Sequence, residues 1–209
     1  MSRYTGPKEK ISRKFGENLG LKAERSFSPK SAFLKKPYRP GQHGKARRRA
    51  LSDFGVQLAE KQKLRYTYGI TERQLRRYFE ESKKKKGITG ELLMKNLETR
   101  LDNAVFRAGL APSRVVARQL TSHGHFLVNG KRITVPSYAL KIGDTFAIRP
   151  QSRPKPMFST LAPRLKKHIL PSWLEMDKKD YDAKVTSEPK ADDLPKNFDM
   201  NAIIAFYSR

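Results

Sequence analysis

The chain has 209 residues, a formal net charge of +25, a pI near 10.4 and no cysteine. The lack of cysteine excludes disulfides, thiol catalysis and thiolate zinc sites. No apolar run approaches the ~18 residues of a membrane-spanning helix, and no basic helix has a wide apolar face, which argues against a membrane partner. The charge is instead typical of proteins that bind a polyanion such as RNA.

Residues 1–50 carry 15 basic and only 3 acidic side chains, with weak apolar periodicity. We expect this arm to fold on RNA, held by RNA contact and by a little packing from Phe15, Leu19, Leu21, Phe27 and Phe33. Its run Lys45-Ala46-Arg47-Arg48-Arg49 either contacts phosphates or is simply a solvated surface. The segment Pro40-Gly41-Gln42-His43-Gly44 lacks the spacing of a nucleotide-binding loop, and we interpret it as a turn that lets the backbone approach RNA. The start, Met1-Ser2-Arg3-Tyr4, has no apolar segment, so no cleaved targeting sequence is expected.

Residues 51–81 have helical periodicity. Thr71 is expected to cap a helix whose residues Leu75, Tyr78 and Phe79 face inward. Arginines then lie on exposed faces, namely Arg65, Arg73, Arg76 and Arg77. The neighbouring tyrosines Tyr66 and Tyr68 either belong to the core or stack on bases, and the pattern does not separate the two.

The run from Leu97 to Gly109 predicts one helix, because its apolar residues recur at helical spacing. Its flank would present Arg100, Asn103 and Arg107 along a single edge. After a break at Ala111-Pro112, Ser113 is a plausible N-cap for a second helix over residues 114–120, in which Arg114 and Arg118 share a face. The free N–H groups at that helix start would favour a phosphate.

A β-hairpin is predicted next, with strands at residues 125–128 and 131–135 joined by Asn129-Gly130. This two-residue loop pairs Phe126 with Ile133 and leaves Lys131 and Arg132 near an exposed tip. Gly143-Asp144 marks a turn before a strand at 145–148. Two helices on a small sheet form a module too small for an enzyme cleft but large enough to contact folded RNA.

Several sequence blocks recur in one order along the whole chain. Beyond Arg3-Tyr4-Thr5-Gly6-Pro7-Lys8 and Pro40 to Gly44, they are Glu60 to Arg65, Tyr68 to Gln74, Arg100-Leu101-Asp102-Asn103, Ala117-Arg118-Gln119-Leu120, His123-Gly124-His125, Val128-Asn129-Gly130, Pro136-Ser137-Tyr138, Pro171-Ser172-Trp173-Leu174 and Phe206 to Arg209. With these blocks the chain resembles the small-subunit ribosomal protein S-four (S4) family of bacterial or organellar type.

The resemblance implies an α+β protein with a mainly helical, discontinuous first domain and an inserted small α/β RNA-binding module of two helices on a small antiparallel sheet. We expect a basic N-terminal arm and helical domain at residues 1–97, completed by the tail 161–209, with the S-four-type RNA-binding domain at 98–160. The basic, Pro-containing segment 150–156 marks the second boundary.

Many members of that family carry a four-cysteine zinc site near the N-terminus. The aligned positions here hold Glu9, Ser12, Ser26 and Ser31. Hydroxyls are poor zinc ligands, so we expect a zinc-free member without any metal or other cofactor.

The resemblance further implies a non-enzymatic, primary binder of small-subunit ribosomal RNA that docks on a helix junction of the 5′ domain and nucleates assembly. Expected partners also include ribosomal protein S-five, at an interface affecting translational accuracy, and messenger RNA where it enters the subunit, on a ribosome in the cytoplasm or an organelle. The predicted RNA-binding residues are Arg3, Lys8, Arg13, Gln42, His43, Arg47, Arg48, Arg49, Lys61, Lys63, Arg65, Tyr68, Arg73, Arg76, Arg107, Ser113, Arg114, Arg118, Gln119, His123, Asn129 and Lys131.

Two other hypotheses stay open at this stage. A free-standing RNA chaperone or ribosome-rescue factor would use the same module, but such proteins resemble residues 98–150 only. Arg100-Leu101-Asp102 also matches a short motif around the catalytic aspartate of some pseudouridine synthases. Without a further catalytic domain to hold a uridine, a carboxylate that balances arginines is the better interpretation of Asp102, so no catalytic residue is expected.

Overall fold

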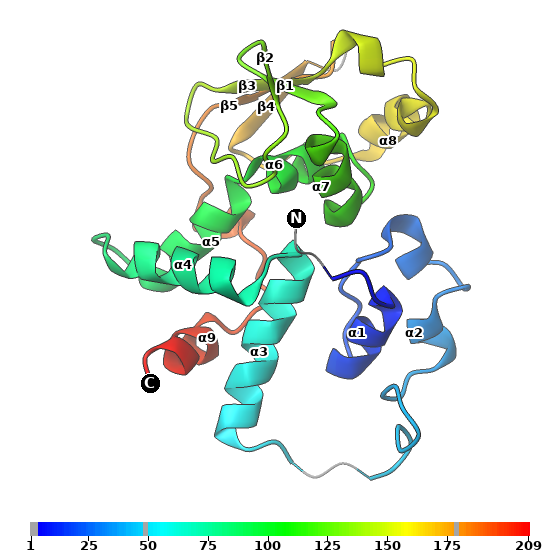
Figure 1. The fold of residues 1–209 in the computed structure, drawn as a ribbon, viewed down its shortest axis with the longest axis vertical. Coiled ribbons are helices and arrows are strands. Elements are labelled where there is room, and N and C mark those ends of the chain that lie inside the picture. The colour runs from blue at the N-terminus through cyan, green and yellow to red at the C-terminus, as the bar shows by residue number, and fades with distance from the viewer. Residues whose placement is uncertain (1–3, 48–49, 178–179) are drawn as a thin grey trace. The chain divides into compact units, whose positions relative to one another are not determined.

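The computed structural model of the chain describes residues 4–47, 50–177 and 180–209. These residues form two compact units (Figure 1). Of these described residues, unit 1 comprises those up to residue 93 together with 196–209, and unit 2 comprises those from 94 to 195. Within the described ranges no helix combines the length and the apolar character needed to cross a bilayer.

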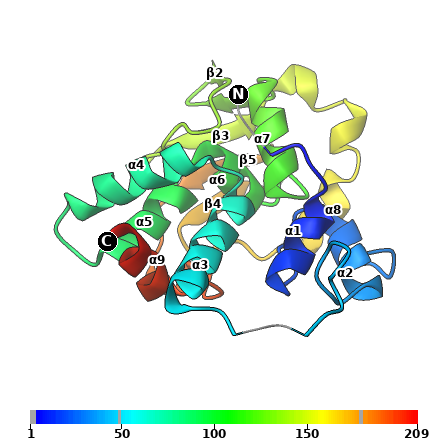
Figure 2. The ribbon, with the colours of Figure 1, turned by 60° about the horizontal axis from the view of Figure 1, so that its bottom comes forward.

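Unit 1 is helical, and its last helix comes from the other end of the chain. Its elements are α1 (Lys8–Phe15), the 3-10 turn η1 (Ala23–Ser26), α2 (Ala32–Lys35), α3 (Asp53–Tyr68), α4 (Glu72–Lys83), the first half of α5 (Thr89–Glu98) and α9 (Met200–Tyr207). Helix α9 packs along α3, as Figures 1 and 2 show. The chain therefore closes unit 1 with a segment more than a hundred residues away in sequence.

Local signals define the ends of α3 and α4. Ser52 Oγ accepts a hydrogen bond from Gly55 N at the start of α3, and Gly69 ends the helix in the left-handed region at φ 63°. The predicted cap at Thr71 is confirmed. Its side chain accepts from Gln74 N, and the Gln74 side chain accepts from Thr71 N, which completes a capping box.

The core of unit 1 lies where α3, α4 and α9 meet. Leu75 and Phe79 are buried as predicted, and Phe79 stacks on Tyr207 of α9 with ring centroids 4.9 Å apart. Tyr207 Oη donates to Glu72 Oε1 at 2.7 Å. Burial, the hydrogen bond to Glu72 and the charge of Glu72 together raise the pKa of Tyr207 far above its usual value.

The N-terminal arm has part of the packing that we expected. Leu19 and Leu21 form a small buried cluster with Ile11 against Phe15 and Tyr66, whereas Phe27 is exposed. The positions aligned with the zinc-site cysteines also hold the arm together, because each side chain accepts a hydrogen bond from a backbone N–H. The pairs are Glu9 with Ala32 N, Ser12 with Leu19 N, Ser26 with Lys22 N and Ser31 with Phe33 N.

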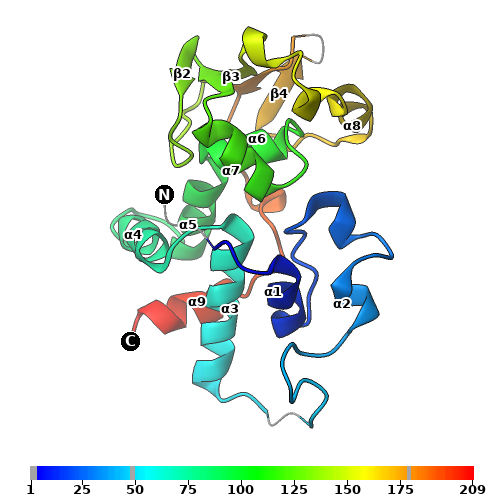
Figure 3. The ribbon, with the colours of Figure 1, turned by 45° about the vertical axis from the view of Figure 1, so that its right-hand side comes forward.

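Unit 2 is a five-stranded antiparallel sheet covered by helices. Its elements are the rest of α5, α6 (Leu101–Arg107), α7 (Arg114–Ser122), β1 (Phe126–Val128), β2 (Lys131–Ile133), β3 (Thr145–Ile148), the 3-10 turns η2 (Pro150–Ser152) and η3 (Pro156–Phe158), α8 (Leu161–Lys167), β4 (Leu174–Asp177), β5 (Asp182–Val185) and η4 (Ala191–Asp193). The strand order is β2-β1-β3-β5-β4. Figure 3 shows α6 and α7 on one side of this sheet.

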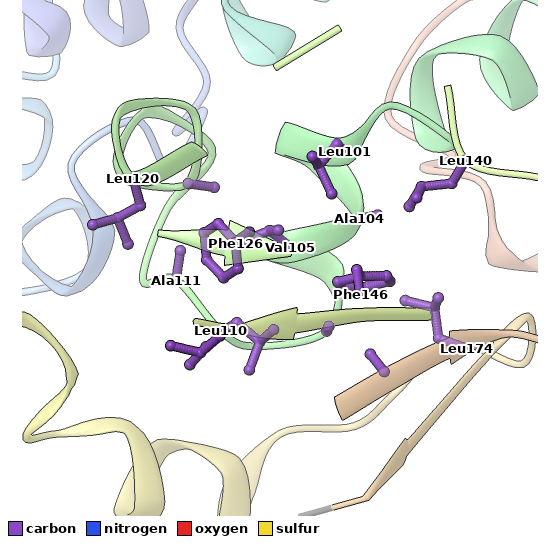
Figure 4. Close-up of a cluster of buried hydrophobic side chains, with 14 of the residues drawn as sticks. Leu101, Ala104, Val105, Leu110, Ala111, Leu120, Phe126, Leu140, Phe146 and Leu174 are labelled. Carbon is purple, nitrogen blue, oxygen red and sulfur yellow. The ribbon is translucent and has the colours of Figure 1, made fainter. Parts of the chain in front are cut away.

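The predicted hairpin is confirmed in position and register. Phe126 pairs with Ile133, and the two loop residues Asn129 and Gly130 take positive φ values of 48° and 76°. Phe126 on β1 and Phe146 on β3 are fully buried against Leu101 and Val105 of α6 (Figure 4). The alternating pattern of the strands thus places the core between the sheet and the two helices.

The prediction of a single helix from Leu97 to Gly109 is wrong. Helix α5 ends at Glu98, Arg100 has the extended backbone of an N-cap, and α6 begins at Leu101. The backbone at the break bonds to a distant segment, with Leu101 N donating to Tyr138 O and Leu140 N donating to Thr99 O. These bonds to residues 37 and 41 positions away replace the local helical bonds that the apolar spacing predicted.

The structure also divides the chain differently from the expected boundaries at 97 and 161. Residues 161–195 belong to unit 2, where β5 pairs with β3 and β4 pairs with β5. The alternating residues Ala183 and Val185 are buried beside Trp173 in the core of this unit. Only residues 196–209 join unit 1. The α+β class and the two helices on an antiparallel sheet are as predicted, with a wider sheet.

Candidate nucleic-acid interface

One exposed face of α4 carries three arginines in unit 1. Leu75, Tyr78 and Phe79 point into the core, which leaves Arg73, Arg76 and Arg77 exposed as predicted. We call these three residues the α4 arginine face. Arg77 makes an exposed ion pair with Glu81 at 3.0 Å, whereas Arg73 and Arg76 have no acidic partner within the described residues. They are available to neutralise phosphates.

Three other residues predicted in unit 1 are turned inward. Lys61 and Lys63 are about 95% buried, and each ammonium binds a carboxylate, with Lys61 2.9 Å from Glu72 and Lys63 2.8 Å from Glu17. Tyr68 is also buried. The sequence suggested free cations here, but α3 uses the long stems of both lysines as core material and satisfies their charges internally. Arg65 is half-buried.

The predicted residues of the N-terminal arm have mixed roles. Arg13 donates from Nε to the carbonyls of Lys36 and Tyr38 and from Nη2 to the carbonyl of Arg39, so it shapes the arm. Gln42 and His43 are exposed in the turn closed by Gly44 N donating to Gly41 O. Lys8 is half-buried and Arg47 is exposed. The predicted contacts Arg3, Arg48 and Arg49 lie outside the described residues.

Two buried carboxylates organise the arginines of unit 2. Glu98 is fully buried, and its Oε2 accepts from Arg107 Nε at 2.6 Å and from Asn103 Nδ2 at 2.9 Å. Arg114 Nη2 lies 3.6 Å from Glu98 Oε1, and Arg114 Nε donates to Asn103 Oδ1 at 2.7 Å. Glu98 thereby links helices α6 and α7.

Asp102 is the second buried carboxylate and binds two arginines. It accepts from Arg100 Nε at 3.0 Å and Nη2 at 2.7 Å, and from Arg118 Nη1 at 3.4 Å. Arg100 is only 1% exposed, so the expected open edge of Arg100, Asn103 and Arg107 does not form. The helix break turns Arg100 onto Asp102 instead.

The result is a set of arginines held in fixed geometry. We call Arg107, Arg114 and Arg118 the clamped arginines, because each binds Glu98 or Asp102. Four guanidinium groups including Arg100 share two carboxylates, which leaves the cluster positively charged. Arg107 and Arg114 keep side-chain exposures of 24% and 17%, whereas Arg118 keeps 9%. Arg107 and Arg114 can therefore face an anion while Arg118 mainly supports them.

Predicted hydrogen-bonding residues nearby serve the fold. Ser113 is buried, and its Oγ accepts from Val116 N, which confirms it as the N-cap of α7. Asn129 accepts from Thr145 N and donates to Asp144 Oδ1, so its side chain holds the hairpin turn.

The remaining predicted residues of unit 2 are exposed. They are Gln119, His123 and Lys131. Arg132 also lies there, donating to the carbonyl of His123 at 3.2 Å across Gly124, which adopts φ 72°.

The two histidines of the His123-Gly124-His125 motif differ in environment. His125 is buried, with Nδ1 2.9 Å from Ser152 Oγ. Burial lowers the pKa of His125, and the charges of Lys155, His123, Arg132 and Arg149 lower it further. Among the described residues, no three His, Asp or Glu side chains are grouped so as to hold a metal ion.

Sequence reasoning missed the role of Glu98 and the positions of the half-buried Arg149 and the exposed Lys155 beside His125. A lone acid inside a basic stretch, as Glu98 is between Lys95 and Arg100, was the available signal.

A basic helical unit and a small α/β module with fixed arginines together define an RNA-binding protein. The chain matches the family models for the Ribosomal protein S4/S9 N-terminal domain over residues 3–98 and the S4 domain over residues 99–146. It is 46% identical to the small ribosomal subunit protein uS4 of Natranaerobius thermophilus and 47% identical to that of Acetivibrio thermocellus, in both cases over 209 residues and the whole of both chains. The uS4 protein of Roseiflexus castenholzii is 45% identical over 212 residues, again with full coverage. The chain belongs to the ribosomal protein S4 family.

Proposed function

We propose that this protein is a structural constituent of the small ribosomal subunit that binds ribosomal RNA directly and catalyses no reaction. The observation that carries this proposal is similarity to uS4 proteins along the whole chain, rather than over the small module alone. A free-standing chaperone or rescue factor would need only the module, and is therefore the weaker hypothesis.

The mechanism that the geometry supports is charge neutralisation by a stiff scaffold. Phosphates repel one another where RNA helices converge, and cations held in fixed positions offset that repulsion in only one arrangement of the helices. The clamped arginines have such fixed positions, because buried carboxylates hold them. The protein would bind a helix junction of the 5′ domain early and keep its helices in place while the body of the subunit assembles.

We infer that RNA contact is made by exposed residues of both units, together with two half-buried arginines of unit 2. In unit 1 these are the α4 arginine face and the arm residues Gln42, His43 and Arg47. In unit 2 they are Arg107, Arg114, Gln119, His123, Lys131 and Arg132. The inward residues Lys61, Lys63, Tyr68, Ser113 and Arg118 would act by supporting this surface. The return of α9 to α3 supports a discontinuous first domain with the RNA-binding module inserted.

Contacts with S-five and with messenger RNA are finer proposals. The strand pair β4–β5 exposes Glu175, Asp177 and Asp182 in a chain that is otherwise strongly basic. An acidic strand pair favours a basic protein over RNA, since like charges repel phosphate. We infer that S-five docks there and that this contact affects translational accuracy.

The test is binding to an isolated transcript of the 5′ domain, together with sedimentation of a cell extract. We expect the protein to sediment almost wholly with small subunits. Its affinity for the transcript should fall steeply as salt rises, because the slope of log K against log salt concentration is about −0.9 for each phosphate neutralised. A protein found mostly off the subunits, or an affinity that does not respond to salt, would contradict the proposal.

A further inference from the structure

Unit 1 contains a cavity of about 480 Å³ between α1, α3 and the segment that joins α2 to α3. One part of its wall is apolar and includes Phe15, Leu51 and Val56. Another part is polar and includes Arg39, Gln62 and Arg65. The volume lies in the range typical of small-molecule sites and greatly exceeds the space of a single phosphate ion.

The polar wall has buried atoms that lack partners. Arg39 Nε, Arg65 Nε and Gln62 Oε1 are each shielded from solvent, and none has a hydrogen-bond partner among the described residues. Buried polar groups in folded proteins are nearly always paired. The three side chains that carry these two orphaned donors and one orphaned acceptor line the same cavity, and a small turn of each would satisfy them on a bound molecule with both kinds of group.

A stacked platform forms part of the same wall. The Arg65 guanidinium lies 4.5 Å from the centre of the Tyr66 ring. Tyr66 is held in turn by the edge of Tyr4, at 5.5 Å and 78°, and by Phe15 at 6.2 Å. Guanidinium planes and aromatic rings are the surfaces on which unpaired RNA bases stack.

The charge around the cavity favours an anionic ligand with an uncharged body. Lys14, Arg39, Lys63 and Arg65 line it, against the two acids Glu17 and Glu60. Lys63 holds both acids, at 2.8 and 3.6 Å. The remaining positive charge attracts a phosphate to the rim, whereas the apolar wall needs something flat and uncharged.

We propose that this cavity binds one unstacked purine nucleotide of RNA. The base stacks on the Arg65–Tyr66 platform, the guanidinium donors of Arg39 meet the acceptors N7 and O6 of a guanine, and Gln62 Oε1 accepts from its amino group. The phosphate of the nucleotide stays at the rim with Lys14. The proposal rests on the proposed RNA-binding function and adds a base-specific contact to it.

The direct test uses the full-length, ¹⁵N-labelled protein with four probes: GMP, UMP, inorganic phosphate and a short apolar peptide. We expect GMP to shift the Nε–H resonances of Arg39 and Arg65 and the amide of Val56, UMP to shift them less, and phosphate to leave Val56 unmoved. Shifts of equal size with phosphate alone, no shifts with millimolar GMP, or shifts at these positions with the peptide but not GMP would each overturn the proposal.

A matched pair of variants tests the cavity in the context of RNA. Val56→Trp fills it, whereas Val135→Trp makes the same change at a similarly exposed valine of unit 2, the two exposures being 43% and 52%. We expect Val56→Trp to weaken binding to the 5′ domain transcript at least about fivefold, since stacking of one base contributes about 1–3 kcal/mol. Val135→Trp should change it less than about twofold.

A second variant covers the case in which tryptophan disturbs α3. Gln62→Leu keeps the approximate size and removes the acceptor, so the preference for GMP over UMP should fall while circular dichroism stays unchanged. If Val56→Trp and Gln62→Leu both behave as the unaltered protein does, the purine site is absent but RNA binding stands. If the unaltered protein itself fails to bind the transcript, the proposed function fails instead.

Discussion

The two sets of arginines that we assign to RNA binding are built in opposite ways. The α4 arginine face is the solvent side of an amphipathic helix, and Arg73 and Arg76 have no acidic partner within the described part of the chain. The clamped arginines are tied to Glu98 and Asp102, which are 100% and 96% buried. Free cations on long stems adapt to many phosphate arrangements, whereas clamped ones fit few. The α4 arginine face would therefore contribute mainly to affinity for RNA, and the clamped arginines mainly to the choice of one RNA geometry.

The largest effect is expected from Glu98→Gln. This change leaves Arg107 and Arg114 beside a neutral amide, and loss of a buried partner typically costs 3–5 kcal/mol. Both arginines are partly exposed and can turn toward water, so we expect the lower end of this range. The free energy of unfolding should fall by about 3 kcal/mol, measured by urea unfolding with circular dichroism.

The control for Glu98→Gln is Glu91→Gln. Glu91 lies on the same helix but is exposed, so its loss should change stability by less than about 0.5 kcal/mol. Equal effects of the two variants would show that Glu98 does not clamp the arginines.

The next effect concerns affinity rather than stability. Replacing Arg73 and Arg76 together by Glu should weaken binding to the 5′ domain transcript at least about tenfold and lower the salt slope by about two, because two phosphate contacts are lost. Stability should stay within about 0.5 kcal/mol, since both side chains are exposed.

A charge-matched control shows whether position matters on the α4 arginine face. Lys141→Glu plus Lys184→Glu makes the same change in net charge at exposed lysines of unit 2. If this pair weakens binding as much, the α4 arginines act only through the overall charge of the protein.

A smaller effect is expected from Thr71→Ala, which removes the capping box of α4. The loss of the bond from Gln74 N to Thr71 Oγ should lower the free energy of unfolding by about 1 kcal/mol. RNA affinity should fall little, because the arginine face keeps its residues. A Thr71→Ser variant, which retains the hydroxyl, should recover most of the stability, and a loss as large with Ser as with Ala would exclude the cap as the cause.

The smallest effect is a pH dependence in unit 2. The pKa of His125 is lowered in the folded state, so above about pH 6.5 the histidine is neutral in both states and has no effect. As the pH falls below about 6.5, the unfolded chain takes up the proton first and the protein loses stability. We expect less than about 1 kcal/mol between pH 7.5 and 5.5, measured by urea unfolding. The loss should be absent in His125→Asn, and an unchanged slope in that variant would assign it to other groups.

Much of unit 2 was predictable because its signals are local. Asn129-Gly130 set the hairpin and its register through their positive φ angles, and Ser113 set the start of α7 through a bond that spans three residues. The site was less predictable. Of the residues chosen as RNA contacts, Arg73, Arg76, Gln119, His123 and Lys131 are exposed, but Lys61, Lys63 and Arg118 are buried in ion pairs. Composition counts cations and does not show which of them already have partners.

The amino-acid sequence by itself determined the net charge, which is a sum over its composition. It also determined the caps, the hairpin and the α+β class, because these depend on residues close together in the chain. Only the tertiary structure decided which cations are free. Lys63 meets Glu17 46 residues away, and the break at Arg100 depends on backbone bonds to residues 138–140. The pairing of β5 with β3 likewise moves residues 161–195 into unit 2. Such contacts form when distant segments are buried together, and no local pattern specifies them.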